Sequence, residues 1–345
     1  MIEEIATDLY RVEIPLPDLP LEFVNSYIIK DGSRHLIVDT GMYHDKCLNA
    51  MQAAMNQLCI DPKKTDYFIT HSHGDHIGLV YKLIQTGSIV YINQLEVETI
   101  SKIRTGVFMS ESANFLRMSG FPEKDPEKII PARATREFKS RETLPFIFVE
   151  DGDTIEIGAY RFTCVKTPGH SKGHICLYET EKKLLIAGDH LLKKITPGIQ
   201  ARLDGDNPLK KYLSSLDKIG QLYVETVLPG HGVIFGDGKK RIEEIKEHHS
   251  ERNREVLSIL KSGSRNIYEI TALMRWNTDC SSWDSTPLIE RYWATGEAFA
   301  HLVYLEEMGK ISKIMKGEEA FYSICGNNAA GNFHSSRKEA EVTSK

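Results

Sequence analysis

The sequence predicts an α/β protein built as a four-layer αββα sandwich, with a small helical domain at its C-terminal end. Two stretches rich in strand-like runs, separated by helices, predict the two sheets of the sandwich. Histidine and aspartate residues directly follow several of these runs, and open α/β sheets tend to place their chemistry at strand ends. After His231 the pattern changes from short strands to long charged helices, which predicts the additional domain.

The composition is that of a folded globular protein. The chain has 345 residues, 41% of them hydrophobic and 26% charged, which is enough apolar material for about two domains. Its net charge of -5 lacks the basic bias typical of proteins that bind nucleic acid or anionic membranes. We find no leader-like pattern at Met1–Tyr10, no apolar run of about 18 residues and no CxxC pair. These features predict a reduced, cytoplasmic protein with no membrane partner.

Short strand-like runs and turns alternate in the first part of the chain. Between Leu9 and Asp39 the runs are separated by prolines and an Asp31-Gly32 turn, which predicts an antiparallel start to the first sheet. A helix over 46–59 and a strand over 67–70 follow, and this strand leads directly into a cluster of histidines. The second β-rich part is predicted from the runs at 143–149, 153–157, 160–167, 175–179, 184–187 and 226–228.

The C-terminal third has a helical pattern. A long charged helix is predicted over 240–262, an amphipathic segment over 268–276, a second helix over 296–308 and a hairpin over 311–324. Helix, helix and hairpin is the order of a winged helix. We therefore predict a catalytic domain at 1–240, a winged-helix-like domain at 241–325 and a disordered tail at 326–345.

Seven residues form a candidate metal site. Four potential ligands lie within one turn after the predicted strand over 67–70, namely His71, His73, Asp75 and His76. Imidazole nitrogen and carboxylate oxygen are ligands that zinc prefers, although a lone HxH pair would be typical of a surface loop. Three more candidates each follow a strand-like run and a glycine that permits a sharp, close turn, namely His170, Asp189 and His231.

These motifs resemble the pattern of the metallo-β-lactamase superfamily, an early Asp, then HxHxDH, then His, Asp and His. The early aspartate corresponds to Asp39 in Ile37-Val38-Asp39-Thr40-Gly41, and the resemblance covers roughly residues 5–240. It implies two divalent metal ions per chain, zinc by default and iron or manganese as alternatives. By this resemblance one ion is held by His71, His73 and His170, the second by Asp75, His76 and His231, and Asp189 bridges them.

The same resemblance implies a hydrolase in which a metal-bridging hydroxide attacks the substrate. The hydroxide exists near neutral pH because two dications lower the pKa of bound water, and Asp75 could also orient it as a catalytic residue. Asp39 is expected to support the ligands, since ligating imidazoles commonly donate their other N–H to a carboxylate. His174 either acts in the same way or caps a turn. His190 is expected to point away from the ions.

The segment 94–144 is predicted to be an insertion that serves as a lid or substrate pocket. It contains a helix-like part over 107–119, whose apolar side chains are candidates for lining an acyl pocket: Phe108, Met109, Phe115 and Met118. The alternative is that these residues form the ordinary core of a helical hairpin. Lys193 and Lys194, with Arg202, could meet a phosphorylated carrier, or they could be solvated surface residues.

The substrate class remains open between several hydrolytic reactions. The helical C-terminal part resembles that of a subfamily with glyoxalase-II-like and acyl-carrier thioesterases and an endoribonuclease. The first hypothesis is hydrolysis of a small-molecule acyl thioester, an acyl-CoA or acyl carrier, and the alternatives are a phosphodiesterase or endoribonuclease and a lactonase. Acidic residues outnumber basic ones between Arg241 and Ile324, which disfavours nucleic acid as a partner. The apolar face of the 240–262 helix needs a partner surface, so a homodimer is a further hypothesis.

Overall fold

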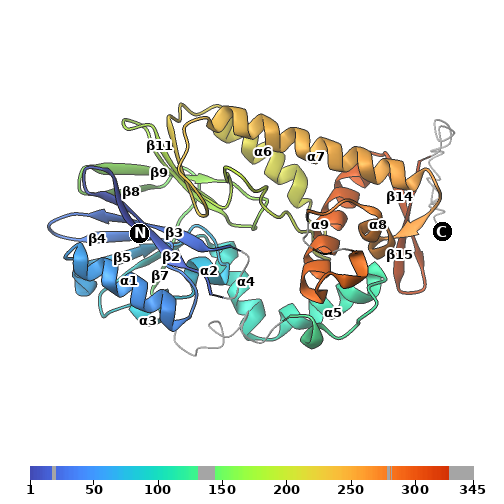
Figure 1. Ribbon diagram of the computed structural model, residues 1–345, viewed down its shortest axis with the longest axis horizontal. Coiled ribbons are helices and arrows are strands. Elements are labelled where there is room, and N and C mark those ends of the chain that lie inside the picture. The colour runs from blue at the N-terminus through green and yellow to red at the C-terminus, as the bar shows by residue number, and fades with distance from the viewer. Residues whose placement is uncertain (18–20, 131–143, 278–279, 281, 326–345) are drawn as a thin grey trace, which may run out of the picture.

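The computed structural model describes residues 1–17, 21–130, 144–277, 280 and 282–325. Part of the predicted insertion, 131–143, and the whole predicted disordered tail, 326–345, lie outside the described residues. Figure 1 shows a body of two packed sheets joined to a group of helices, which we call the C-terminal module and define as residues 261–325.

The first sheet has seven strands, paired in the order in which they occur in the chain. Neighbours from β1 to β4 are antiparallel and neighbours from β4 to β7 are parallel, so the predicted antiparallel start is confirmed. The strands are β1 (Ile2–Ala6), β2 (Leu9–Pro15), β3 (Phe23–Lys30), β4 (His35–Val38), β5 (Thr65–Phe68), β6 (Val90–Ile92) and β7 (Phe146–Phe148). The edge strand β1 is not evident in the sequence because Ile-Glu-Glu-Ile-Ala lacks a period of two.

The second sheet has five strands in the order β12-β11-β10-β9-β8. Only β11 and β12 are parallel, and the other neighbours are antiparallel. The strands are β8 (Thr154–Ile157), β9 (Tyr160–Lys166), β10 (Ile175–Glu179), β11 (Leu184–Gly188) and β12 (Thr226–Pro229). All five agree with the strands predicted from sequence, because each is a short strand-like run bounded by glycine or a turn.

Successive side chains of a strand point to opposite faces, and here each face builds a different core. Leu177 of β10 and Val38 of β4 lie in the core between the two sheets. Their neighbours face outward, Cys176 into the core beneath the helices of the second sheet and Ile37 into the core beneath those of the first. Each sheet is therefore covered on both sides.

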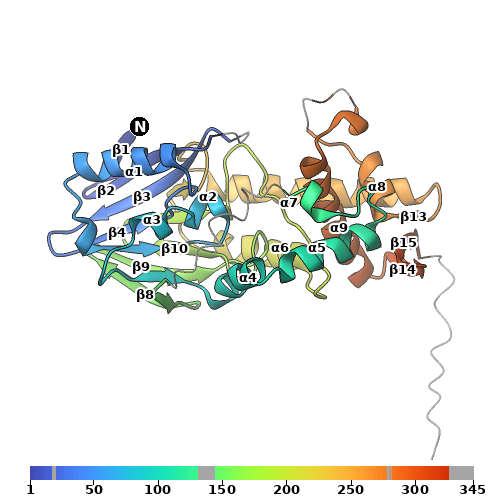
Figure 2. The same ribbon diagram turned by 90° about the horizontal axis from the view of Figure 1, so that it is seen from below.

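Helices form the two outer layers. On the first sheet lies α1 (Asp45–Gln57), which His44 caps and which buries Cys47, Met51, Ala54 and Met55 at helical spacing. The short helices α2 (Gly74–Ile77) and α3 (Val80–Leu83) lie beside it, and α6 (Pro208–Gly220) and α7 (Gly238–Leu260) cover the second sheet (Figures 1 and 2). The order helix, sheet, sheet, helix confirms the predicted αββα sandwich.

The C-terminal module has the predicted order of elements. It contains β13 (Arg265–Asn266), α8 (Ile267–Leu273), α9 (Leu288–Glu307), β14 (Ile311–Lys316) and β15 (Glu319–Ile324), and its sheet has the order β13-β15-β14. Short 3-10 turns lie at η1 (Pro62–Lys64), η2 (Pro126–Lys128) and η5 (Trp283–Ser285). The predicted division at residue 240 falls near the start of α7, whose buried Ile242, Ile245, Val256 and Leu260 pack within the same chain.

The insertion reaches the C-terminal module. Its helices α4 (Gln94–Arg104) and α5 (Val107–Ser119) run from the sandwich along the lower edge of Figure 1 to the module. The ring of Phe115 in α5 lies 6.0 Å from that of Tyr292 and 5.7 Å from that of Phe299, both in α9. α5 and α9 thus share one core. Within the described ranges, no helix combines the length and the apolar character needed to cross a lipid bilayer.

Candidate metal centre

The seven predicted ligands come together where strands of both sheets end. The loop after β5 carries His71, His73, Asp75 and His76, while His170, Asp189 and His231 follow β9, β11 and β12. Because β11 and β12 are parallel and pair Gly188 with Pro229, the residues that follow them are side by side. The centre therefore lies between the two sheets and draws side chains from each.

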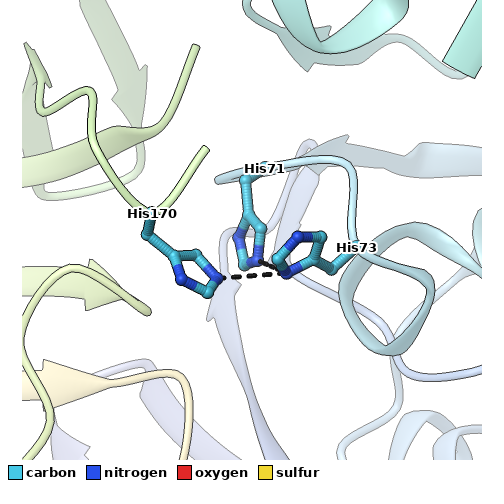
Figure 3. A group of neighbouring side chains, drawn as sticks. All are labelled: His71, His73 and His170. Atoms are coloured by element: carbon cyan, nitrogen blue, oxygen red, sulfur yellow. Dashed lines mark hydrogen bonds between the residues drawn. The ribbon is translucent and has the colours of Figure 1, made fainter. Parts of the chain in front are cut away.

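The first group of candidate ligands consists of three histidines. The Nε2 atoms of His71 and His170 each lie 3.0 Å from the Nδ1 atom of His73. Figure 3 shows the three rings turned toward one another. His71 is completely buried, whereas His170 and His73 border the more open side of the centre. Three imidazole nitrogens therefore face a common point.

The second group consists of Asp75, His76 and His231, with Asp189 between the two groups. The Nε2 atom of His231 lies 3.3 Å from Oδ2 of Asp75, and Nε2 of His76 lies 3.8 Å from the same oxygen. Oδ2 of Asp189 lies 3.6 Å from Nε2 of His170 and 3.5 Å from Nε2 of His231. The Asp189 carboxylate is thus in reach of both groups.

The donor atoms fit a pair of metal ions. Ligands of a tetrahedral ion at about 2.1 Å are about 3.4 Å apart, close to the separations found here. Three sets of donor atoms lie within 4.8 Å of one another: His71, His73 and His170; His71, His76 and Asp189; and Asp75, His76 and His231. Nε2 of His76, Nε2 of His231 and Oδ1 of Asp189 are buried and have no hydrogen-bond partner, which a polar atom tolerates poorly unless it binds an ion. The cluster can hold metal ions.

Three of the imidazoles are oriented through their other nitrogen. Nδ1 of His170 donates to the carbonyl of Gly198, and Nδ1 of His231 donates to that of Phe23, both at 2.9 Å. Nδ1 of His71 lies 3.0 Å from the hydroxyl of Thr70. These contacts fix the tautomer that leaves Nε2 free to bind a metal.

Asp39 lies where its predicted supporting role requires. Oδ2 accepts from Nδ1 of His76 at 2.7 Å and from the hydroxyl of Thr70 at 2.8 Å, and Oδ1 accepts from the amide of Thr70 at 2.9 Å. The residue follows β4 with a φ of 56°, in the left-handed region that aspartate tolerates better than most residues. One carboxylate thus orients His76 directly and His71 through Thr70.

His174 supports the centre from the second sheet. Its Nδ1 donates to the Thr167 hydroxyl at 2.8 Å, and its Nε2 accepts from the backbone amide of Asp189 at 3.2 Å. Of the two alternatives, the structure favours the one in which His174 positions a neighbouring residue of the cluster. His190 is fully buried and its ring lies 5.3 Å from that of Tyr212, outside the three sets of donor atoms.

Glu96 joins the two ligand loops, and its sequence context gives no sign of this. It is completely buried near the start of α4. Oε2 accepts from the amide and hydroxyl of Ser72, at 2.8 and 2.5 Å, and Oε1 accepts from the amide of Gly173 at 2.6 Å. Asn25 of β3 likewise holds the His231 loop, donating to the carbonyls of Pro229 and Gly232 at 2.9 Å each. Both residues emerge only when the chain is folded.

Glycine allows the close approach that the sequence suggested. A Cβ added to Gly230 would lie 2.4 Å from Oδ1 of Asp189 and 2.9 Å from Cε1 of His76. A Cβ added to Gly188 would lie 2.7 Å from Nε2 of His174, and the φ of this residue is 48°. Any side chain at these positions would displace the cluster.

The electrostatics of the metal-free cluster divide the histidines into two kinds. Burial and the neighbouring imidazoles lower the pKa of His170 to about 4 and that of His71 well below its usual value, so both are neutral. Burial also lowers the pKa of His73, and of the surrounding charges Asp75 and Asp189 oppose this while His76 and Arg202 add to it. The first group is therefore ready to bind an ion without losing protons.

The second group holds protons that an ion must displace. Burial disfavours the charged form of His231, but Asp189 and Asp75 outweigh it and raise its pKa to about 10. Burial likewise opposes the charge of His76, and Asp39, Asp189 and Asp75 again prevail and raise its pKa well above the usual value. Both imidazoles are therefore protonated at neutral pH in the metal-free chain.

We expect metal loading to release protons. Ligating imidazole must be neutral, so below the folded pKa of about 10 an ion competes with the proton on His231, and apparent affinity rises with pH. The measurement is a zinc titration of the metal-free protein in weak buffer at neutral pH with a pH indicator. His231→Gln should release about one proton fewer than the wild type. A titration that releases no protons would contradict this assignment.

The predicted substrate-binding residues lie at different places. Phe115 is 2% exposed and packs against α9, which favours the alternative that it is ordinary core. Phe108, Met109 and Met118 are partly buried against the same core, and a substrate role for them stays a prediction. Lys193 bonds to Asp237 at 2.5 Å and Lys194 is exposed, and within the described ranges no hydrogen bond or ion pair joins either lysine to the seven residues.

Comparison with known proteins identifies the family. The sequence profile of the Metallo-beta-lactamase superfamily matches residues 19–231. The chain therefore belongs to the metallo-beta-lactamase superfamily, and it is a hydrolase of that superfamily with a cluster able to hold metal ions.

Two curated relatives and one solved structure show the extent of the similarity. The chain is 28% identical over 228 residues to the Acyl-coenzyme A thioesterase MBLAC2 of Homo sapiens, covering 61% of this chain and 74% of that one. It is 25% identical over 266 residues to the Atrochrysone carboxyl ACP thioesterase nsrC of Aspergillus novofumigatus, covering 77% and 66%. A metallo-beta-lactamase family protein from Thermus thermophilus superposes with a TM-score of 0.78 at 27% identity, covering 93% of this chain and 100% of that one. The C-terminal module is thus part of the shared fold.

Proposed function

We propose that this protein is a binuclear metal-dependent thioesterase that hydrolyses a small-molecule acyl thioester. The observation that carries the proposal is the cluster of seven ligands, in which Asp189 lies within 3.6 Å of donor atoms from both groups. The named activities of the human and Aspergillus relatives, both thioesterases, support the choice of a thioester over other carbonyl substrates.

Zinc is the proposed metal. One ion would be held by His71, His73 and His170, the other by Asp75, His76 and His231, with Asp189 shared between them. Nitrogen and carboxylate ligands at tetrahedral spacing suit zinc, and iron and manganese accept the same donors. When bound, such ions supply Lewis acidity that polarises a carbonyl and makes water acidic enough to attack near neutral pH.

Residues of the chain would orient the attacking water and keep the metal site in place. Asp75, whose side chain is 19% exposed, can accept a hydrogen bond from the attacking water and hold it toward the thioester carbonyl. Asp39 and His174 would keep His76 and the backbone of Asp189 in place. The products would be a carboxylic acid and a free thiol, with the elements of water divided between them.

Metal analysis combined with thiol release tests the proposal. We expect two zinc ions per chain and thiol release from a panel of acyl-CoA substrates by the zinc-loaded protein. Asp75→Ala should lower kcat/KM by about 10²-fold, since a positioned carboxylate contributes about this much to proton transfer and orientation. Asp217→Ala, which removes an exposed aspartate of α6 paired with Lys246, is the matched control and should keep the wild-type rate.

The possible outcomes test the metal site and the substrate class independently. Two metals without thiol release would refute the thioesterase proposal and favour phosphodiester or lactone substrates for the same cluster. Fewer than two metals in protein purified and reloaded with zinc would refute the binuclear centre. A cytoplasmic location and a homodimer remain predictions.

A further inference from the structure

One loop links the metal centre to the C-terminal module. The carbonyl of Gly198 accepts a hydrogen bond from the ligand His170 at 2.9 Å. Three residues later, the amide of Ala201 donates to the carbonyl of Gly296 in α9 at 3.1 Å. A Cβ on Gly296 would lie 3.3 Å from the side chain of Gln200, so the loop lies directly on the helix. The C-terminal module therefore lies against the loop that supports the metal centre.

Arg202, the residue after Ala201, also contacts the C-terminal module. Its Nη1 donates to the hydroxyl of Tyr292 in α9 at 2.7 Å, and its guanidinium carbon lies 5.4 Å from the ring centre of Phe108 and 5.8 Å from that of Tyr292. The hydroxyl of Tyr292 is in turn 3.0 Å from that of Ser112 in α5. Aromatic rings from the insertion and the module thus hold one guanidinium in place.

Arg202 lies on the same loop as Gly198, which contacts the metal cluster. Four residues of extended chain span at most about 14 Å, which limits its distance from Gly198, whose carbonyl contacts His170. The guanidinium is therefore within reach of an acyl chain that extends from the centre along this loop.

The charge of Arg202 has no carboxylate partner within the described ranges. Its hydrogen bonds there go to Tyr292 and, at 3.4 Å, to the side-chain oxygen of Gln200, both uncharged. By contrast, the buried Arg252 contacts Glu255 at 2.9 Å and Glu297 at 3.9 Å. A partly buried guanidinium with unused N–H donors is suited to bind a carboxylate in a forked geometry.

We propose that Arg202 binds a carboxylate at the far end of the acyl group, so that this enzyme prefers thioesters of dicarboxylic acids. The inference rests on the proposed thioesterase function and names the substrate class within it. The phosphates of a coenzyme A carrier are a second source of negative charge, but a long pantetheine arm separates them from the thioester. A guanidinium held on the loop that contacts His170 is better placed to meet the acyl part.

Paired substrates test the assignment. Malonyl-, succinyl- and glutaryl-CoA are compared with propionyl-, butyryl- and valeryl-CoA on the zinc-loaded protein. We expect the wild type to favour the carboxylated member of at least one pair by about tenfold or more in kcat/KM. Arg202→Gln should lower kcat/KM for that substrate by about 10- to 100-fold, mainly through KM, and leave its uncharged partner within about threefold.

Matched variants and truncated substrates separate binding of the acyl carboxylate from binding of the carrier phosphates. Arg254→Gln, an exposed arginine of α7 paired with Glu247, is the matched control and should change neither series. Arg202→Lys keeps the charge but not the fork and should fall between wild type and Arg202→Gln. The same acyl groups on N-acetylcysteamine lack phosphates, so an effect of Arg202→Gln that vanishes with them would overturn the proposal in favour of the carrier phosphates.

Two failures can be told apart. If Arg202→Gln lowers both series alike, or if the wild type shows no preference, Arg202 has a structural role and the proposal is wrong. If the wild type hydrolyses neither series, the thioesterase function fails instead. In that case, calorimetric binding of glutarate against valerate to zinc-loaded wild type and Arg202→Gln decides the role of the arginine, and equal affinities would overturn it.

Discussion

Asp189→Asn is expected to lower kcat/KM for thioester hydrolysis by at least about 10³-fold. The carboxylate is the one side chain of the described residues whose oxygens lie within 3.6 Å of nitrogens from both ligand groups. Asparagine keeps the volume and the backbone amide that donates to His174, but it offers one neutral oxygen where two charged ones stood. A loss of this size corresponds to about 4 kcal/mol of transition-state stabilisation.

The same variant should also bind fewer metal ions, and metal analysis beside the rate shows whether the two losses coincide. Asp217→Asn on the surface of α6 serves as the control, with unchanged metal content and rate. If Asp189→Asn kept two ions and more than a tenth of the wild-type activity, the bridging role of this carboxylate would have to be abandoned.

Gly230→Ala should be nearly as damaging although it removes no ligand. The new Cβ would lie 2.4 Å from Oδ1 of Asp189 and 2.9 Å from Cε1 of His76, closer than real Cβ atoms approach such neighbours. The backbone here is also held, because its amide donates to the carbonyl of Gly188 at 2.7 Å. We expect the second group of ligands to shift and kcat/KM to fall by at least about 10²-fold, since a misplacement of about 1 Å costs this much.

A suitable comparison is Gly32→Ala, where nothing lies within 4 Å of the added Cβ. Thermal unfolding of both variants shows whether the chain still folds. Wild-type metal content in a folded Gly230→Ala protein would mean that the close approach at this glycine has no functional importance.

The strand ends and the seven residues of the metal cluster could be predicted because their signals are local. His71 to His76 occupy one turn, and Gly169, Gly188 and Gly230 mark the three other places where a strand gives way to a ligand. The strands of the second sheet are equally local, since a short apolar run bounded by turn residues is visible within about five residues. Such local patterns can be recognised in a single sequence.

The supporting residues could not be predicted because their partners are distant in the chain. Glu96 is 24 residues from Ser72 and 77 from Gly173, and nothing around it distinguishes it from a surface glutamate of a helix. Arg202 meets Tyr292 across 90 residues. Asp39 was accessible only because family resemblance points to it. Contacts between side chains of separate loops depend on the tertiary packing, and the periodicity of the sequence does not predict them.

Because α5 and α9 share one core, each of these two parts of the sequence depends on the other to bury its apolar side chains. Phe115 lies at the end of the chain's first third and Phe299 in its last third, yet their rings are 5.7 Å apart. Deletion of either segment would leave an apolar face of the other in water. We expect relatives of this protein to gain or lose the two segments together, so that the presence of one segment in a new sequence predicts the presence of the other.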